Sequence, residues 1–392
     1  MNENQNPVRL LNGQYVLLTL INFVVSVSYS MVSTIMAKYL GSIGLSIAVA
    51  GAITGAFSIA SMVARPFTGI INDRLNRKLL LIGATGGMAL CTMLYGLTDV
   101  YGVLLAVRFL HGMFFAFSST VNMAVIPELV PEKRVTEGLS YYGVVQSIGV
   151  AVGPSIGLAL INMGGYRMNF IASGVLALLG AGAACILRPF SGAQRAPKNR
   201  KIHRKDIIAV ECLAFAAVDV AIAMANGLEN SMIALYGAQQ GIANIGWYFT
   251  ISAIVLCVTR VLFGRLADRC GVAFSLYPGL GLMILGFLIL WRASSPWMFA
   301  AASVIKTTGV GLARPAIQAA CVRAVPPERR GSASSTYYIG SDIGQGTSPA
   351  IGGRIVDMTG DYGLAFLLFT LPLMLGAGIF GWASRRRKGR QM

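Results

Sequence analysis

The sequence has few charged residues for its length. Asp, Glu, Lys and Arg together make up 12% of its 392 residues, whereas ordinary soluble domains carry about 25%. Hydrophobic residues make up 55% of the chain, and the mean hydropathy is +0.66. This composition excludes an ordinary soluble domain and indicates an integral membrane protein.

The chain also lacks the motifs of several function classes. It contains no phosphate-binding glycine loop of the Walker type, so ATP is not the evident energy source. Its two histidines and six cysteines show no metal-ligand spacing, and the cysteines give no disulfide framework. The first apolar run is too long for a removable signal peptide and lacks a small-residue cleavage site. We therefore expect no metal, no other cofactor, no enzymatic activity and a first helix that stays in the mature protein.

Acidic residues are scarce, and the net charge is +17. The location of the basic residues decides between nucleic acid and a membrane surface as the partner. Much of the positive charge lies in the segments 74–78, 188–205 and 385–390, which fall on one side of a membrane if the helices alternate. Cytoplasmic loops show this pattern under the positive-inside rule. It predicts contact with anionic lipid headgroups and argues against nucleic-acid binding.

Apolar segments recur along the whole chain, and about 20 residues are needed for one crossing of a bilayer. Only segment 188–206 is polar, basic and long enough to link two bundles. It divides an N-terminal bundle at 1–187 from a C-terminal bundle with a basic tail at 207–392, and it places the linker and both termini in the cytoplasm. Twelve transmembrane helices are expected near 15–37, 46–70, 79–98, 101–125, 138–162, 165–187, 207–235, 245–266, 273–292, 297–322, 334–356 and 363–383.

A charged segment occurs twice at matching places. Segment 69–78 reads Gly-Ile-Ile-Asn-Asp-Arg-Leu-Asn-Arg-Lys, and segment 264–271, 195 positions later, reads Gly-Arg-Leu-Ala-Asp-Arg-Cys-Gly. An arginine precedes each segment, at Arg65 and Arg260. A repeat of 195 in a chain of 392 residues indicates two halves of about six helices each, as in many secondary transporters.

Segment 69–78 resembles the loop between the second and third helices of the major facilitator superfamily: glycine, three residues, aspartate, basic, any residue, glycine, basic, basic. Asn76 stands where glycine is usual, and asparagine is the next-best residue for a left-handed turn. The resemblance implies a cytoplasmic gate, in which Asp73 faces a helix N-terminus or a basic partner. The alternative is a charged turn that only obeys the positive-inside rule. The predicted gate residues are Gly69, Asp73, Arg74, Arg77, Lys78, Gly264, Asp268 and Arg269.

Small residues form a strip on the fifth predicted helix. Gly149, Gly153 and Gly157 repeat every fourth residue, so another helix can pack closely against them. Pro154 frees the carbonyl of Val150 and kinks or loosens the helix. The run resembles the superfamily's antiporter motif, which is typical of drug and metabolite exporters, and the alternative is a generic packing face. A degenerate copy follows at the offset of 195, at Gly344, Ser348, Pro349 and Gly352.

The fourth predicted helix carries Arg108, His111 and Gly112 on one face. This resembles a second motif of the superfamily, in which arginine is followed by a polar residue, usually glutamine, and glycine. Histidine titrates near neutral pH, so His111 either joins a proton path or replaces glutamine as a hydrogen-bonding residue, and we favour the replacement.

Other polar residues share single faces of otherwise apolar predicted helices. Such residues either line a polar cavity or bond to a neighbouring helix. The candidates for the cavity and for substrate contact are Asn22, Ser26, Arg108, Gln146, Asn226, Lys306, Tyr338 and Gln345.

Ionisable residues lie at membrane depth in the second half. An unpaired charge there costs at least a few kcal/mol, so a functional role is the default and structural ion pairs are the alternative. Asp219 lies nearest the middle of its helix, and we rank it first as the proton-coupling carboxylate. Asp342 lies where Lys306 or Arg314 can pair with it, and Glu229 is nearer the outer water. The proton-coupling candidates are Asp219, Asp342, Glu229 and His111.

Taken together, the resemblance implies an all-α membrane protein of twelve helices in two pseudo-symmetric six-helix bundles, with a central polar cavity. We expect a monomeric exporter of a small organic solute in a bacterial inner membrane, driven by proton entry. A facilitator or an importing proton symporter on the same fold is the first alternative. A receptor or scaffold that transports nothing is the remote one. The mixed charges of the cavity candidates favour a zwitterionic, anionic or otherwise polar substrate, whose identity stays open.

Overall fold

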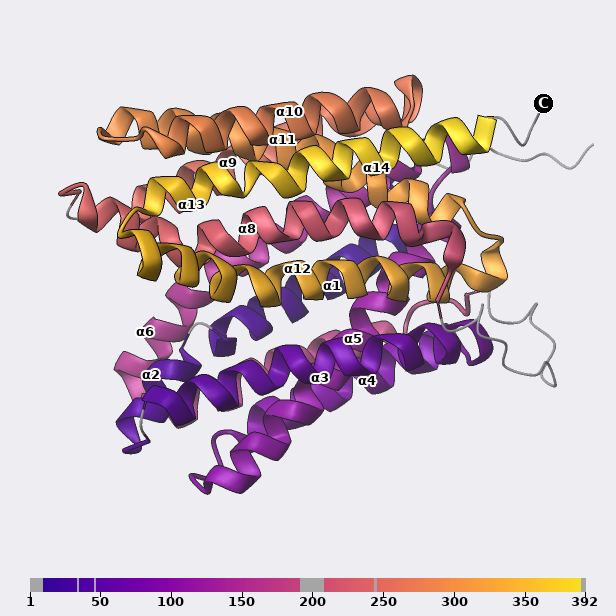
Figure 1. Cartoon of the computed structure of the whole chain (residues 1–392). Coiled ribbons are helices and arrows are strands. Elements are labelled where there is room, and N and C mark those ends of the chain that lie inside the picture. Colours follow the sequence, from indigo (N-terminus) through magenta and orange to yellow (C-terminus); the bar gives the residue numbers. More distant parts are fainter. Residues whose placement is uncertain (1–9, 34, 46, 191–207, 243–244, 389–392) are drawn as a thin grey trace, which may run out of the picture. The chain divides into compact units, whose positions relative to one another are not determined.

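The computed structural model describes residues 10–33, 35–45, 47–190, 208–242 and 245–388. Every regular element in these ranges is a helix, as the predicted all-α class requires (Figure 1). Short 3-10 helices lie at Glu132–Arg134, Val210–Cys212 and Pro327–Arg329. The α-helices are α1 (Gly13–Ser33), α2 (Met36–Ser42), α3 (Ile47–Arg74), α4 (Arg77–Leu94), α5 (Tyr101–Leu129), α6 (Val135–Ala184), α8 (Leu213–Gln239), α9 (Gly246–Cys270), α10 (Val272–Trp291), α11 (Pro296–Arg323), α12 (Arg330–Thr359), α13 (Tyr362–Leu368) and α14 (Thr370–Lys388).

The helices follow the apolar runs of the sequence. Helices satisfy their own backbone hydrogen bonds, which a hydrocarbon environment demands. Among the described residues, seven helices are long and apolar enough by themselves to cross a membrane: α1, α4, α5, α6, α8, α10 and the pair α13 and α14. The remaining long helices, α3, α9, α11 and α12, have 25 to 30 residues and carry the charged repeats and several of the cavity candidates.

The described helices form two compact units. The first contains residues 1–132, 142–208 and 326–335, and the second contains 133–141, 209–325 and 336–392. The chain therefore changes unit near residue 208, and the first turns of α6 and α12 each belong to the opposite unit from the rest of the helix. The predicted linker at 188–206 lies almost wholly outside the described residues.

Two helix boundaries differ from the expected ones. The span expected at 15–37 ends at Ser33, and the short helix α2 follows it. The span expected at 363–383 is divided into α13 and α14 at Phe369. The fifth and sixth spans are separated where expected, because Gly164 and Gly165 have non-helical backbone angles, with a φ of 74° at Gly165.

The expected left-handed turn at Asn76 is wrong. Its φ of −63° and ψ of 110° are extended. The side chain of Asn76 accepts hydrogen bonds from the backbone N–H groups of Lys78 and Leu79, at 2.9 and 3.4 Å. Asn76 is therefore the N-cap of α4, a role for which asparagine is among the preferred residues.

Each unit has its own packed interior. In the first unit, α3 and α4 pack against α5, and a cluster of buried residues that includes Tyr39, Tyr95, Val107 and Phe170 fills the end nearest α2. In the second unit, α10 packs against α11 and α14, as Figure 1 shows, and α14 also contacts α8.

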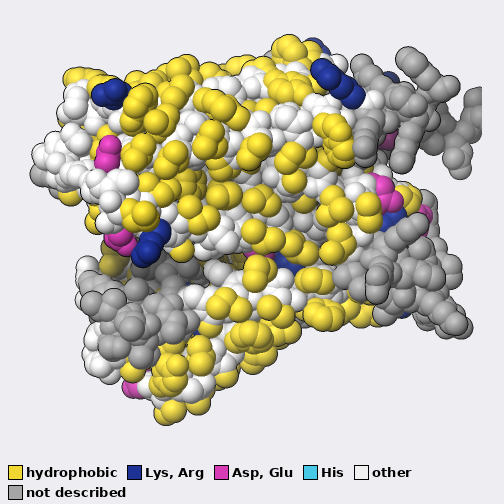
Figure 2. Space-filling view, in the orientation of Figure 1, with side chains coloured by type: hydrophobic (Ala, Val, Ile, Leu, Met, Phe, Trp, Pro, Cys, Tyr) yellow, Lys and Arg dark blue, Asp and Glu magenta, His cyan; other side chains and the backbone are white. Residues whose placement is uncertain are grey.

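Large hydrophobic side chains are exposed along the helices. Figure 2 shows hydrophobic side chains over most of the visible helix surface, with Lys and Arg mainly near helix ends. Leu90, Leu262 and Leu375 are each more than 60% exposed. A soluble monomer rarely exposes so much contiguous apolar surface, whereas lipid chains match it.

Candidate functional site

The carboxylate of Asp73 lies at the N-terminus of α12. It accepts hydrogen bonds from the backbone N–H groups of Gly331 at 2.6 Å and Ser332 at 2.9 Å, and from the Ser332 hydroxyl at 2.7 Å. The first N–H groups of a helix have no partner within that helix, and the helix dipole favours a negative charge beside them. Asp73 on α3 thus caps a helix that begins 257 residues later.

Gly69 allows this contact because it lies one helical turn before Asp73. A β-carbon at Gly69 would lie 2.8 Å from the β-carbon of Ser335 and 3.0 Å from the α-carbon of Ser332. The Ser335 hydroxyl also donates a hydrogen bond to the carbonyl of Arg65. Only glycine lets α3 approach the first turn of α12 so closely.

Arg77 joins the neighbouring elements. Its guanidinium is buried, forms an ion pair with Glu128 at the end of α5, and lies 3.3 Å from the Asp73 carboxylate. It also donates to the carbonyl of Pro327 at 3.2 Å. Arg74 is half-buried, and Lys78 donates to the carbonyl of Cys185 at 2.7 Å. Described contacts therefore join α3 or α4 to α5, to Cys185 just after α6, and to the start of α12. The predicted gate residues that make them are Gly69, Asp73, Arg77 and Lys78.

The second charged repeat gives less information. Gly264 and Asp268 lie within α9, but their side chains are outside the described set, and Arg269 is exposed near the end of that helix. The gate role predicted for these three residues stays a prediction.

The glycine strip of α6 faces α1. A β-carbon at Gly149 would lie 2.9 Å from the β-carbon of Ser26, and one at Gly153 would lie 2.8 Å from the carbonyl oxygen of Val27. At Gly157 it would lie 2.6 Å from a methyl of Ile35. The strip therefore brings two helix backbones together along three turns.

Pro154 leaves a carbonyl free, and α1 supplies its partner. The Ser30 hydroxyl donates to the carbonyl of Val150 at 2.7 Å. Proline has no N–H, so the Val150 carbonyl lacks its usual partner within the helix. Asn22 also bonds across the same pair of helices, to the carbonyl of Tyr142 at 3.5 Å. For Asn22 and Ser26 this geometry favours the packing alternative, because both are buried between α1 and α6.

The second unit repeats this arrangement with α8 and α12. A β-carbon at Gly344 would lie 2.4 Å from the carbonyl oxygen of Val220, and one at Gly340 would lie 2.6 Å from that of Ala216. Gly227 on α8 faces Ser348 in the same way. Sequence comparison of the halves found Gly344 and Ser348 but missed Gly340 and Gly227.

Asp219 lies at the centre of a buried polar cluster in the second unit. Its Oδ1 accepts a hydrogen bond from the Tyr337 hydroxyl at 2.7 Å and lies 3.4 Å from Nε of Arg314. Arg314 also lies 3.3 Å from the Tyr337 hydroxyl and donates to the Ser341 hydroxyl at 2.5 Å. Asp219 itself is fully buried. The cluster thus joins α8, α11 and α12 through one carboxylate and one guanidinium.

Glu229 forms a second buried ion pair, with Lys306. Glu229 is 3% exposed and Lys306 is 5% exposed, whereas the expected place of Glu229 nearer the outer side of the membrane stays a prediction. A carboxylate at this depth needs such a partner. Both basic residues that we considered as partners of Asp342 thus bond to other carboxylates, Lys306 to Glu229 and Arg314 to Asp219.

The remaining candidates of the second unit lie on α8 and α12. Tyr338 is half-buried and packs edge-on against Tyr337, with ring centroids 5.3 Å apart. Asp342 and Asn226 are half-buried, and Gln345 is exposed. In the first unit, Gln146 on α6 is half-buried.

Arg108 and His111 lie in an aromatic cluster of the first unit. The Arg108 guanidinium carbon lies 5.2 Å from the ring centroid of Phe57 and 5.7 Å from that of Tyr95. The Tyr95 hydroxyl lies 3.1 Å from Nδ1 of His111 and also interacts with Arg108. His111 is 1% exposed. This geometry favours the hydrogen-bonding role of His111 over a place in a proton path.

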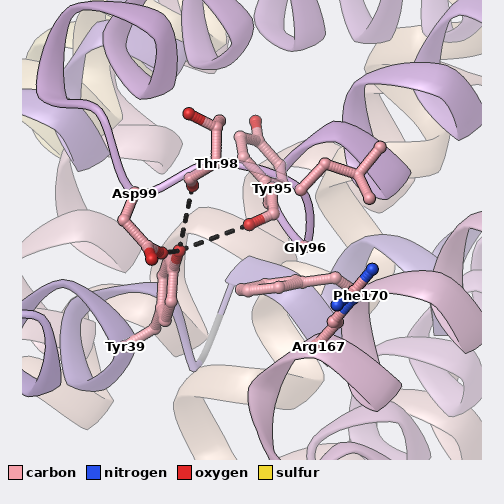
Figure 3. Close-up of a pocket in the computed structure, with 8 residues that line it drawn as sticks. Tyr39, Tyr95, Gly96, Thr98, Asp99, Arg167 and Phe170 are labelled. Carbon is pink, nitrogen blue, oxygen red and sulfur yellow. Dashed lines mark hydrogen bonds between the residues drawn. The ribbon is translucent and has the colours of Figure 1, made fainter.

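A pocket of about 300 Å³ lies beside this cluster, between α2, the connection from α4 to α5, and the second part of α6. Figure 3 shows the Tyr39 hydroxyl directed at Asp99, Thr98 and the Tyr95 carbonyl, and its bond to the Asp99 carboxylate is 2.7 Å long. Burial and the Asp99 carboxylate raise the pKa of Tyr39, so its hydroxyl stays protonated as the donor. Tyr95 lines the pocket and also contacts Arg108.

Comparison with known proteins finds a matching family model, similar sequences and similar solved structures. The family model of the Major Facilitator Superfamily matches residues 18–242 and 212–391. An uncharacterized MFS-type transporter of Methanocaldococcus jannaschii is 23% identical, over 86% of this chain and 90% of the relative. The multidrug resistance protein MdtG of Enterobacter lignolyticus is 25% identical, over 94% of this chain and 91% of the relative. The crystal structure of the human organic anion transporter MFSD10 has a TM-score of 0.83 at 14% identity, and the match covers 93% of this chain and 98% of that one.

Proposed function

Because this chain belongs to the Major Facilitator Superfamily and is a multi-pass membrane transporter of that fold, we propose that it exports a small organic solute in exchange for protons. The observation that carries the proposal is the contact between the buried Asp219 and the partly buried Arg314 in the second unit. Proton coupling requires a group that changes charge inside the protein and thereby changes its contacts.

The Asp219 cluster has the parts that such a switch needs. When Asp219 is ionised, it holds Arg314 and the Tyr337 hydroxyl. When a proton binds, the carboxyl loses its charge, and Arg314 is left without its anionic partner. Breaking a fully buried ion pair by removal of one partner costs about 3–5 kcal/mol, and the cost is smaller here because the Arg314 side chain is 20% exposed. Protonation therefore favours a different arrangement of α8, α11 and α12, in which Arg314 finds another partner or water.

Export as the direction is supported by α6 and by the relatives. The run Gly149 to Gly157 has the antiporter pattern and packs tightly on α1. The MdtG proteins of Enterobacter lignolyticus and Proteus mirabilis, 25% and 27% identical, are named multidrug resistance proteins. We therefore favour a drug or metabolite exporter over a facilitator or an importing symporter.

The gate in this proposal is the contact between Asp73 and the start of α12. The capping bonds hold α3 against the first turn of α12 while they exist, and transport requires that they break and re-form in each cycle. Glu128 and Arg77 keep the Asp73 side of the contact in place. The transporter would operate as a monomer in a bacterial inner membrane, with both termini in the cytoplasm and with protons, the solute and lipids as its partners.

The test is transport by the purified protein in proteoliposomes with an imposed pH gradient. A mixed panel of drugs and metabolites is placed on one side, and solute movement against its own gradient is measured. We expect movement opposite to proton flow. Movement with proton flow would establish a symporter, movement that ignores the gradient a facilitator, and no movement of any solute would favour the receptor or scaffold.

A further inference from the structure

The guanidinium of Arg108 is buried in the first unit without an anionic partner. Arg108 is 1% exposed, and its Nε and Nη1 atoms have no hydrogen-bond partner among the described residues. Burying a charge with unbonded N–H groups is strongly unfavourable. The protein keeps this charge in place even though a glutamine or methionine would fit an apolar site at less cost.

Among the described residues of the first unit, no carboxylate forms an ion pair with Arg108, and Asp99 accepts the hydrogen bond of Tyr39 instead. The acidic residues in the membrane helices of this unit are Asp73 and Glu128, at the ends of α3 and α5, and both contact Arg77. Arg65, also buried on α3, instead donates to the carbonyl of Ala116 at 3.2 Å and to the Ser119 hydroxyl at 2.6 Å. Arg108 therefore differs from Arg65 in having unbonded donors, and from Arg314 and Lys306 in having no acid.

Aromatic rings lie beside the unpaired guanidinium. The rings of Tyr29, Phe57 and Phe115 come from α1, α3 and α5, and their centroids are 5.2 to 5.4 Å apart. Phe57 is buried and lies over Arg108, whereas Tyr29 and Phe115 are half-buried. Ring faces attract a cation, but their contacts with N–H groups are weaker than the charge-assisted bonds that a carboxylate accepts. The Tyr95 hydroxyl, which lies 3.1 Å from Nδ1 of His111, also interacts with the guanidinium.

We propose that Arg108 binds the anionic group of the transported solute, and that Tyr29, Phe57 and Phe115 hold its aromatic part, so that the substrates are aromatic carboxylates. This inference rests on the proposed transport function and names the substrate class for it. A guanidinium binds a carboxylate through two parallel N–H bonds, from Nε together with Nη2 or from Nη1 together with Nη2. The unbonded Nε and Nη1 atoms of Arg108 leave an open donor on each of these two edges. The Phe57 ring lies 5.2 Å from the guanidinium carbon, so it shifts when the carboxylate binds and then stacks with Tyr29 and Phe115 on the aromatic body.

The test compares ligands that share one aromatic body and differ in charge. The probes are naphthalene-2-carboxylate, its amide and trimethyl(2-naphthyl)ammonium, with the same three head groups on one-ring and three-ring bodies. Calorimetric titration of the purified, detergent-solubilised chain measures their affinities. We expect at least one carboxylate to bind, and to bind at least tenfold tighter than its amide and its ammonium counterpart.

Variants then assign this preference to Arg108. In Arg108→Gln the carboxylate and the amide should bind within about threefold of each other, whereas Arg108→Lys should keep part of the preference. The ratio is measured within each variant, so a smaller folded fraction does not change it. Arg167→Gln removes an exposed positive charge from the same unit and should leave the ratio unchanged.

Several results would overturn the assignment: no binding by any carboxylate, equal affinities in the unmodified chain, a preference for the ammonium compounds, or a preference that survives Arg108→Gln. The titration uses no membrane and no pH gradient. A failure of proton-driven export therefore leaves a measured carboxylate preference intact, and export of cations without this preference overturns only the substrate class.

Discussion

At the scale of single residues, the two oxygens of Asp219 have different environments. Oδ1 accepts the bond from Tyr337 and faces Arg314, whereas Oδ2 is buried and has no hydrogen bond in the part of the chain that the structure describes. An oxygen with open lone pairs is the one that can take up a proton without first breaking a bond. We therefore assign the proton in the proposed cycle to Oδ2.

This assignment predicts the behaviour of Asp219→Asn. Asparagine keeps the shape of the side chain but cannot bind and release a proton. The pH-driven transport should therefore fall at least tenfold in proteoliposomes, while exchange of solute without a gradient is at least partly retained. Tyr337→Phe is the paired variant: it removes one hydrogen bond but keeps the carboxylate, and it should reduce the rate without abolishing the response to pH. Transport by Asp219→Asn at the unmodified rate would remove Asp219 from the mechanism, and Asp342 would be tested next.

Asp73 gives the second prediction at this scale. Asp73→Asn keeps one acceptor oxygen but loses the charge beside the α12 N-terminus, where a capping interaction is worth about 1 kcal/mol. Transport should fall several-fold with near-normal expression. Asp357→Asn, an exposed acid at the far end of α12, is the control and should transport normally. If Asp73→Asn also does so, segment 69–78 is only a charged turn.

Single residues also show where sequence reasoning fails. The buried position of Asp219 could be predicted from its place in the helix, and a helix terminus or basic partner for Asp73 could be predicted from the motif. The side chains that bond to Asp219 could not be predicted, because neighbouring residues on a helix point about 100° apart. Tyr338 was selected from the stripe it shares with Asp342, yet Tyr337 is the residue that bonds Asp219. The sequence alone does not reveal how α12 is rotated about its axis, so it does not reveal which of its residues bonds to Asp219.

At the scale of helices, close contact between backbones recurs in both units. The α1 and α6 pair uses Gly149, Gly153 and Gly157, and the α8 and α12 pair uses glycines from both helices. The strip on α6 could be predicted because its glycines follow the period of a helix. The strip on α12 is degenerate in sequence, and only the structure shows that Gly340 extends it toward the start of the helix.

Gly153→Leu tests the α1 and α6 contact. A side chain at Gly153 would overlap the Val27 carbonyl and the Ser30 side chain, so the two helices must separate. We expect transport to fall at least tenfold and ligand binding to be affected less, because the cycle requires the helices to move together. Gly182→Leu, in the second part of α6, is the control, since no atom apart from its chain neighbours and the adjacent helix backbone lies within 4 Å of an added β-carbon there. Equal transport by both variants would show that close packing at Gly153 is not needed.

At the scale of the whole molecule, most of the fold could be predicted from the composition and from the 195-residue repeat. Apolar runs of about 20 residues located the helices, and the offset of 195 between charged segments located the two halves. The exchange of the first turns of α6 and α12 between the units was not predictable. It depends on long-range contacts, such as that of Asp73 with Gly331, which leave no periodic signal in the sequence.

The same scale gives the last prediction, the orientation in the membrane. Segments 74–78, 188–205 and 385–390 carry the basic clusters, and a membrane with anionic lipids on its cytoplasmic face retains such segments there. Cys185 and Cys270 have exposed thiols and are first replaced by alanine. In intact cells, an impermeant maleimide should then label Ser294→Cys, in the connection between α10 and α11, whereas Arg200→Cys should be labelled only after permeabilisation. The reverse pattern would place Asp73 and the start of α12 at the outer face. The contact between them would then be an outer gate, and the proposed coupling of proton entry to export would have to be derived for the opposite orientation in the membrane.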